Sequence, residues 1–272
     1  SWEYKFLRLL ADSNEQLSLA CVIRAGETSY YSQGLPETEK ADGFPREQGL
    51  YNQFDAVLMD TRAFPLCHDA TIKSLLGFVE HRGGGVLFFG PLAGIPDAIR
   101  EALPVTRAEF LPAGKPIRLK VNTEFVFEIS PGNVLERPTG LEVEHGSLVS
   151  FVEETKPGAR PAAMSAGSEK PLVVAQSYGS GRVAFVAFES SWRWRLSSSA
   201  GREIHDEFWK QLLGWLGSTS KERVAPTCDG AKSTVGDELA LDVDVLGTDF
   251  RPAANARVSC DITAPDGATR TL

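Results

Sequence analysis

Cysteine, histidine and long apolar runs are scarce in this chain of 272 residues. Its four cysteines, Cys21, Cys67, Cys228 and Cys260, show no C-x-x-C spacing, so the usual zinc-binding pattern is absent. Cys228 and Cys260 fall in one C-terminal segment and could pair; the alternative is that they are small buried apolar side chains. No run of about 18 apolar residues occurs, which excludes a membrane-spanning helix within the sequence.

Basic residues are fewer than acidic residues in this chain. Lys and Arg total 28 against 36 Asp and Glu, and the formal net charge is −8. An acidic chain without a basic run argues against nucleic acid as a partner. With 42% hydrophobic and 24% charged residues, the composition is that of an ordinary globular protein. The length allows one large domain or two smaller ones.

The first hundred residues alternate between helical and strand-like patterns. Apolar residues at helical spacing mark 2–11 and 72–79, the second behind a cap expected at Asp69. Short apolar runs at 55–59 and 86–89 predict buried strands. Such alternation favours a mostly parallel sheet flanked by helices, with right-handed crossovers.

The pattern changes twice further along the chain. At about 104–170, period-two stretches with intervening Pro and Gly predict a β-rich insertion, after which 202–216 returns to a helix that packs on the sheet. Alternation over 224–272 predicts the start of an immunoglobulin-like β-sandwich with about four of the usual seven strands. We therefore expect an α/β domain at 1–217, a truncated sandwich at 224–272, and an excised piece of a longer protein.

Six short segments between residues 2 and 217 carry a family resemblance. They include Trp-Glu-Tyr-Lys-Phe-Leu at 2–7, Gly-Gly-Gly-Val-Leu-Phe-Phe-Gly at 83–90 and Ser-Trp-Arg-Trp-Arg at 191–195; the others are 54–58, 178–183 and 208–212. In combination they resemble the class I glutamine amidotransferase-like superfamily, in particular uncharacterised domains of large bacterial membrane-anchored proteins. The resemblance implies a flavodoxin-like sheet. It also implies, in working members, a Cys on a strand-to-helix turn and a His aided by a Glu after a later strand.

This chain departs from the family's catalytic pattern at both positions. The stretch 86–94 holds neither Cys nor Ser, and Pro91 removes an N–H from the turn that would supply oxyanion donors. After the later strand, Glu189 stands without a His. Because nucleophile and base are both missing, we expect no glutaminase activity, no catalytic residue, no cofactor and no metal site.

A cluster of Trp and Arg follows the strand predicted at 182–188, in what we expect to be a loop. Two Arg residues beside Trp rings could bind a carboxylate, a phosphate or the acidic loop of a partner. The alternative is structural, with Arg193 or Arg195 paired to Glu189, Asp206 or Glu207. The candidate ligand- or partner-binding residues are Phe89, Gly90, Glu189, Trp192, Arg193, Trp194 and Arg195.

Three functional hypotheses follow. We favour a non-catalytic interaction module with an unknown protein partner, placed by the resemblance in the periplasm with its membrane anchor outside this sequence; cytoplasmic placement is the alternative. The second hypothesis is a site for a small polar ligand, such as a sugar, near 89–90 and 192–195. The third is a hydrolase in which Cys67, His68, Glu189 and His205 would converge, although His205 is expected to be a partly exposed helix residue.

Overall fold

The structure is a computed structural model that describes residues 2–35, 43–111, 117–121, 141–143, 149–166, 170–189, 191–228 and 240–271. The chain divides into two compact units, Ser1–Ser220 and Lys221–Leu272. Among the helices within those described ranges, none has the length and apolar character needed to span a bilayer.

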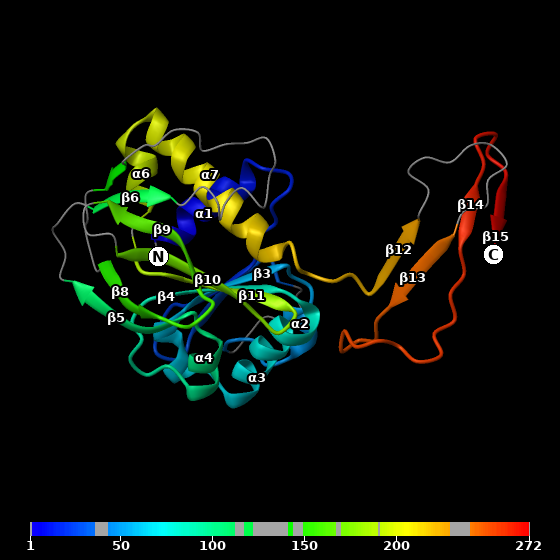
Figure 1. Cartoon of the computed structure of the whole chain (residues 1–272), viewed down its shortest axis with the longest axis horizontal. Helices are drawn as coiled ribbons and strands as arrows, with labels where there is room; N and C mark the ends of the chain where they lie inside the picture. The colour runs from blue at the N-terminus through cyan, green and yellow to red at the C-terminus, as the bar shows by residue number, and fades with distance from the viewer. Residues whose placement is uncertain are drawn as a thin grey trace. The chain divides into compact units, whose positions relative to one another are not determined.

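A seven-stranded mixed sheet forms the centre of the first unit (Figure 1). Its strand order is β3 (Ala56–Asp60), β4 (Gly85–Phe89), β11 (Gly181–Val186), β10 (Pro171–Tyr178), β9 (Arg160–Ala166), β6 (Ile117–Val121) and β7 (Leu141–Val143). β3, β4 and β11 are parallel, whereas every pair from β11 to β7 is antiparallel. The expected flavodoxin-like, mostly parallel sheet is therefore wrong.

The connections explain the mixed sheet. β10 and β11 are joined by the two residues Gly179 and Ser180, and such a short link permits only antiparallel pairing. Gly179 has a φ of +59°, and an added Cβ would lie 2.6 Å from the Cα of Glu80, so glycine is required there. From the β-rich section expected at about 104–170, β6, β7 and β9 extend the main sheet. Two strands of that region, β5 (Val105–Leu111) and β8 (Val149–Thr155), form a separate two-stranded sheet.

Helices lie on both sides of the sheet. On one side, at the top of Figure 1, are α1 (Trp2–Asp12), α6 (Trp192–Ser197) and α7 (Ser199–Gly217); on the other are α2 (Gln48–Tyr51), α3 (Asp69–Gly77) and α4 (Asp97–Ala102). Between them the central strands are buried, with Phe88 and Phe185 at most 1% exposed. α3 is capped by His68 and not, as expected, by Asp69: His68 Nδ1 accepts a hydrogen bond from the Ala70 N–H.

Three shorter elements complete the first unit. β1 (Cys21–Arg24) and β2 (Tyr30–Gln33) form their own antiparallel pair. A 3-10 helix at Thr61–Leu66 follows β3 directly. A π-helical turn at Phe78–Arg82 extends α3 and ends at Gly83, whose φ is +76°. Gly83 thus ends this helix in the left-handed conformation that glycine adopts most readily.

The second unit contains two separate antiparallel pairs. β12 (Val224–Cys228) pairs with β13 (Leu241–Val245), and β14 (Asp261–Thr263) pairs with β15 (Thr269–Thr271). A sandwich needs inward-facing side chains from two packed sheets, but Phe250 is the buried hydrophobic residue among the described residues of this unit. The expectation of an immunoglobulin-like sandwich is therefore not met there. Cys228 and Cys260 are free thiols, so the possible disulfide is absent.

Candidate functional site

Two carboxylates and one guanidinium meet where the parallel strands end. Asp60 is the last residue of β3, and Glu189 follows β11, with β4 between those two strands. Arg62 bridges them: its Nη2 lies 2.8 Å from Asp60 Oδ2 and 2.9 Å from Glu189 Oε1. We call Asp60, Arg62 and Glu189 the carboxyl-edge cluster. The carboxyl ends of the strands are the usual position of ligand sites in open α/β sheets.

The chain immediately after β3 fixes Arg62 against Asp60. Asp60 caps the 3-10 helix, because its Oδ1 accepts a hydrogen bond from the backbone N–H of Arg62 at 3.0 Å. The same oxygen accepts from Arg62 Nε at 2.9 Å, while Oδ2 accepts from Nη2. Backbone and side chain of Arg62 are thus held by one carboxylate, which orients its guanidinium before any ligand arrives.

Gly90 makes room for this arrangement at the end of β4. Its φ is +106°, and an added Cβ would lie 2.5 Å from Thr61 Oγ1 and 3.0 Å from Asp60 Oδ1. Thr61 is fully buried and donates its hydroxyl to the carbonyl of Pro91 at 2.7 Å. The predicted site residues Gly90 and Phe89, the last residue of β4, therefore lie at the end of the middle strand. Gly90 contributes close packing there, not a side chain.

The carboxyl-edge cluster is partly open to solvent and carries more negative than positive charge. The side chains of Arg62, Asp60 and Glu189 are 44%, 35% and 21% exposed. Burial raises the pKa of Glu189; Arg62 opposes that rise, whereas Asp60 and Glu3 add to it. Its hydrogen bond to Asp60 is the main reason that the pKa of Arg62 is raised. Glu189 thus binds a proton more readily than an exposed carboxylate would.

The Trp/Arg segment forms the short helix α6 and not the expected loop. Trp194 is 2% exposed and packs between Phe188, at 5.3 Å, and Phe208, at 5.4 Å between ring centroids. Arg195 forms an ion pair with Asp206 of α7. Trp194 and Arg195 therefore join α6 to the core and to α7. This is the arrangement that the structural alternative proposed for Arg195.

The other half of α6 faces the N-terminal helix. Trp192 stacks on Phe6 of α1, with ring centroids 6.1 Å apart and an interplanar angle of 8°, and the Arg193 guanidinium lies 4.7 Å from the Trp192 ring centroid. Glu3 accepts hydrogen bonds from the backbone N–H groups of Ser191, at 2.8 Å, and of Trp192, at 3.1 Å. The carboxylate that binds at the start of α6 is therefore that of Glu3, a residue of the chain itself.

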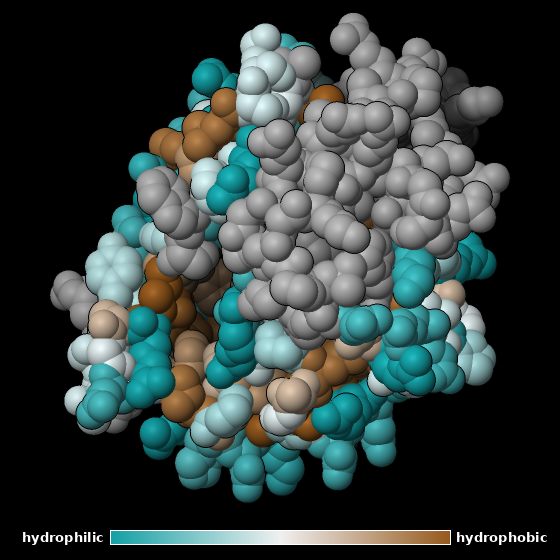
Figure 2. Space-filling model, turned by 90° about the vertical axis from the view of Figure 1, so that its left-hand side faces the viewer, coloured by the Kyte–Doolittle hydropathy of each residue, from teal (hydrophilic) through white to brown (hydrophobic). Residues whose placement is uncertain are grey.

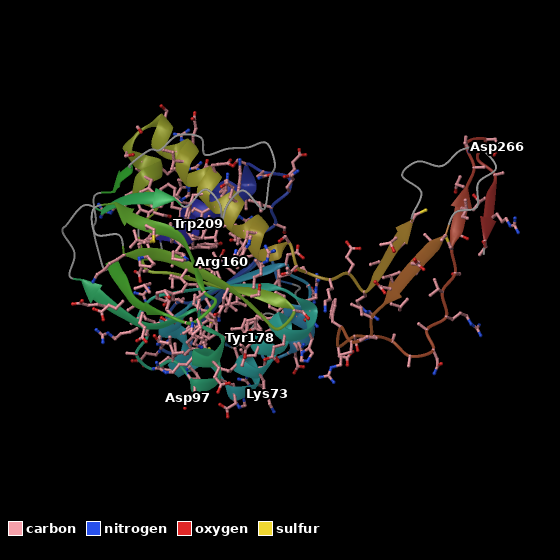
Figure 3. The ribbon with its side chains drawn as sticks, viewed as in Figure 1. Lys73, Asp97, Arg160, Tyr178, Trp209 and Asp266 are labelled. Atoms are coloured by element: carbon pink, nitrogen blue, oxygen red, sulfur yellow. The ribbon has the colours of Figure 1, made fainter. Side chains whose placement is uncertain are left out.

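A hydrogen bond between Ser191 and Trp209 joins the start of α6 to α7. Ser191 is fully buried, and its hydroxyl accepts a hydrogen bond from Trp209 Nε1 at 2.8 Å. Figure 3 shows Trp209 on the side of α7 that faces the sheet. The Glu3 contact was not found from the sequence, because the residues that it joins are 188 and 189 positions apart. Its one local signal was an acidic residue in the first turn of an amphipathic helix.

The residues of the rearranged-hydrolase hypothesis serve different partners. His205 is fully buried, which corrects the expectation of partial exposure; its Nδ1 lies 2.9 Å from Asp206 Oδ1, and burial lowers its pKa. The Cys67 thiol donates to the carbonyl of Ala63 at 3.3 Å, and burial raises its pKa to about 11. His68 is occupied as the cap of α3. Within the ranges that the structure describes, no group of His, Cys, Asp and Glu could hold a metal ion.

Comparisons with known proteins give distant structural likenesses. No family model and no curated protein matches the chain. The cytoplasmic protein STM3548 from Salmonella typhimurium is 13% identical with a TM-score of 0.47, over 73% of this chain and 94% of its own. A β-galactosidase from Rahnella sp. R3 is 15% identical with a TM-score of 0.43, over 81% of this chain and 31% of its own. The GH42 β-galactosidase Gan42B is 12% identical with a TM-score of 0.40, over 66% of this chain and 24% of its own.

These likenesses are too weak to transfer a function. This chain spans less than a third of either β-galactosidase. The resemblance to amidotransferases drawn from the sequence is nonetheless wrong: no family model matches the chain, and its central sheet is mixed and not flavodoxin-like. Gly-rich turns and apolar strands, which carried part of the resemblance, also occur in unrelated folds.

Proposed function

We propose that the chain is a non-catalytic recognition module that binds at the carboxyl-edge cluster and leaves its partner chemically unchanged. The observation that carries this proposal is the state of Cys67, the nucleophile of the rearranged-hydrolase hypothesis. Cys67 is half-buried, its thiol donates to a backbone carbonyl, and its pKa of about 11 leaves it almost wholly protonated at neutral pH. A protonated thiol is a poor nucleophile.

The partners of Asp60, Glu189 and His205 also favour binding over catalysis. Asp60 and Glu189 both form ion pairs with Arg62. His205, the one fully buried histidine in the described residues, is bonded to Asp206. Fixed charges of this kind recognise a ligand by position and hydrogen bonding. The role as a module of a larger protein, and its placement outside the cytoplasm, stay predictions that a topology reporter fused to the full-length protein would check.

Turnover assays test the proposal directly. The chain is incubated with glutamine, with p-nitrophenyl esters and with p-nitrophenyl glycosides, beside Cys67→Ser and Glu189→Gln variants. We expect no product above the buffer rate from any of the three proteins. Turnover that disappears in either variant would establish the rearranged hydrolase in place of the binding module, because both variants keep side-chain size nearly constant.

The nature of the partner is a separate question with a simple screen. A ligand that binds the folded state raises the melting temperature, by an amount that grows with its concentration relative to Kd. Thermal shift against sugars, amino acids and nucleotides therefore separates a small polar ligand from a protein partner. A shift with one class supports the small ligand, and no shift with any class favours the protein partner.

A further inference from the structure

We propose that the carboxyl-edge cluster binds a small, uncharged ligand with adjacent hydroxyl groups, that is, a sugar or another polyol. This inference rests on the proposed function and specifies its ligand class. Three observations carry it: the hydrogen-bonding capacity that the cluster leaves over, the net charge that it presents, and the surface on the side that the carboxyl ends of the strands face.

The cluster keeps both donor and acceptor capacity within the described part of the chain. Arg62 uses Nε and Nη2 for its carboxylate partners, and in the described part of the chain its Nη1 has no hydrogen-bond partner. Glu189 Oε1 lies 2.9 Å from Arg62 Nη2, yet among the described residues it is a buried atom without a hydrogen-bond partner, so this carboxylate keeps acceptor capacity. Arginine can only donate and an ionised carboxylate can only accept, whereas a hydroxyl does both. We therefore expect two neighbouring hydroxyl groups to pair with Arg62 Nη1 and with the Glu189 carboxylate together.

The charges disfavour ionic ligands of either sign. An anion would approach Asp60 and Glu189, and Glu3 lies close enough to influence Glu189 electrostatically. A cation would compete with Arg62, which both carboxylates already hold. A neutral polyol displaces neither ion pair and loses less hydration on binding than a charged group does. The fixed Arg62 guanidinium also costs little further side-chain entropy when it binds.

The surface on this side of the molecule is hollowed. α6 follows β11 and lies at the left of Figure 1, so the carboxyl ends of the parallel strands face that side. Figure 2 looks at the same side and shows a hollow with hydrophobic residues on its floor and hydrophilic residues along its rim. Polyols present C–H groups as well as hydroxyls, so a surface of this kind, on the side that the carboxyl ends of the parallel strands face, suits both parts of such a ligand.

Calorimetric titration of the full chain with myo-inositol, D-galactose and D-glucose tests the inference. Cyclohexanol serves as the matched ligand control, since it has the ring size of inositol but a single hydroxyl. We expect saturable one-to-one binding of at least one polyol and none of cyclohexanol. Arg62→Ala and Glu189→Gln should each weaken that binding about tenfold or more, the loss expected when one charge-assisted hydrogen bond is removed.

Arg24→Ala and Glu203→Gln are the matched protein controls. Arg24 donates to backbone carbonyls of its own hairpin, and Glu203 is exposed on α7, so both should bind the polyol as the unmodified chain does. Circular dichroism confirms that each variant is folded. The inference would be overturned if cyclohexanol bound as tightly as the polyols, or if the Arg62 and Glu189 variants bound the polyol as tightly as the unmodified chain does.

Failure of this inference and failure of the proposed function give different results. No saturable binding of any polyol, with no turnover in the assays above, refutes the ligand class and leaves a binding module for another partner. Polyol binding accompanied by turnover of a glycoside refutes the non-catalytic function while it supports the ligand class.

Discussion

The contact between Glu3 and the start of α6 gives the sharpest test of how the first unit is held together. Glu3 lies in the first turn of α1, yet both of its carboxylate oxygens accept hydrogen bonds from backbone N–H groups 188 and 189 positions away. We expect Glu3→Ala to detach the start of α1 from α6. The stacked pair of Phe6 and Trp192 would then be the main remaining contact between these helix ends.

The magnitude follows from the two bonds. A hydrogen bond to a charged group contributes about 1.5–3 kcal/mol, and the half-buried position of Glu3 argues for the lower end of that range. Glu3→Ala should therefore destabilise the unit by about 3 kcal/mol, because two backbone donors are left without a protein partner. For a unit of this size that lowers Tm by about 6–12 °C. Glu3→Gln keeps one acceptor oxygen and should cost about half as much.

Urea denaturation followed by Trp fluorescence measures the loss, and hydrogen exchange at the Ser191 and Trp192 amides locates it. Glu15→Ala removes the same charge from an exposed position just after α1 and is the control. If Glu3→Ala is no less stable than this control, and the two amides exchange no faster, the assignment of Glu3 as the link between α1 and α6 is refuted.

Three further predictions concern single residues. Gly90→Ala should destabilise the unit by about 2 kcal/mol or more in urea, because alanine is strained at a φ of +106° and its Cβ would crowd Thr61; unchanged stability would contradict the role given to Gly90. Burial lowers the pKa of His205 in the folded chain, against the opposing effect of Asp206. The contribution of His205 to stability is therefore present above about pH 6.5, the pKa of an unfolded histidine, and is lost as the pH falls towards the lower pKa of the folded chain. Between about pH 7 and 5, the stability of His205→Asn should fall less steeply than that of the unmodified chain. The thiol of Cys67, with its pKa of about 11, should react with iodoacetamide about 100-fold more slowly than an unperturbed thiol, as mass spectrometry of timed samples would show; fast labelling would contradict its burial.

Local elements of this fold could be predicted from the sequence because local rules decide them. The helix at 2–11, the strand at 86–89 and the helix at 202–216 all appear, within a few residues, as α1, β4 and α7. Apolar spacing and flanking turn residues suffice for such elements. The pairing of strands could not be predicted in the same way. Nothing in the period-two pattern at 117–121 distinguishes a strand of a separate insertion from β6, which hydrogen-bonds to β9 more than 40 residues further on.

The site illustrates the same division. The sequence analysis placed Phe89, Gly90 and Glu189 at strand ends, and there the structure has them. It missed Asp60 and Arg62, although an Asp at the end of a predicted strand followed two residues later by Arg was a usable signal. It also treated residues 192–195 as one surface. In a helix, successive side chains point in different directions, so Trp192 faces α1 whereas Trp194 enters the core.

The exposed fraction of the side chain distinguishes charged groups that stabilise the fold from charged groups that are available to a ligand. Arg195 and Asp206 are 14% and 19% exposed, and breaking such a pair leaves a buried charge without a partner, so Arg195→Ala should cost about 3 kcal/mol of stability. Arg62 is 44% exposed, and its ion pairs contribute about 0–1 kcal/mol after solvent screening. Arg62→Ala should therefore leave Tm nearly unchanged and yet weaken polyol binding about tenfold or more, whereas Arg195→Ala should lower Tm without changing Kd at temperatures where it is folded. If both variants lowered Tm by the same amount, Arg62 would be a structural residue, and the proposed role of the carboxyl-edge cluster in recognition would be refuted.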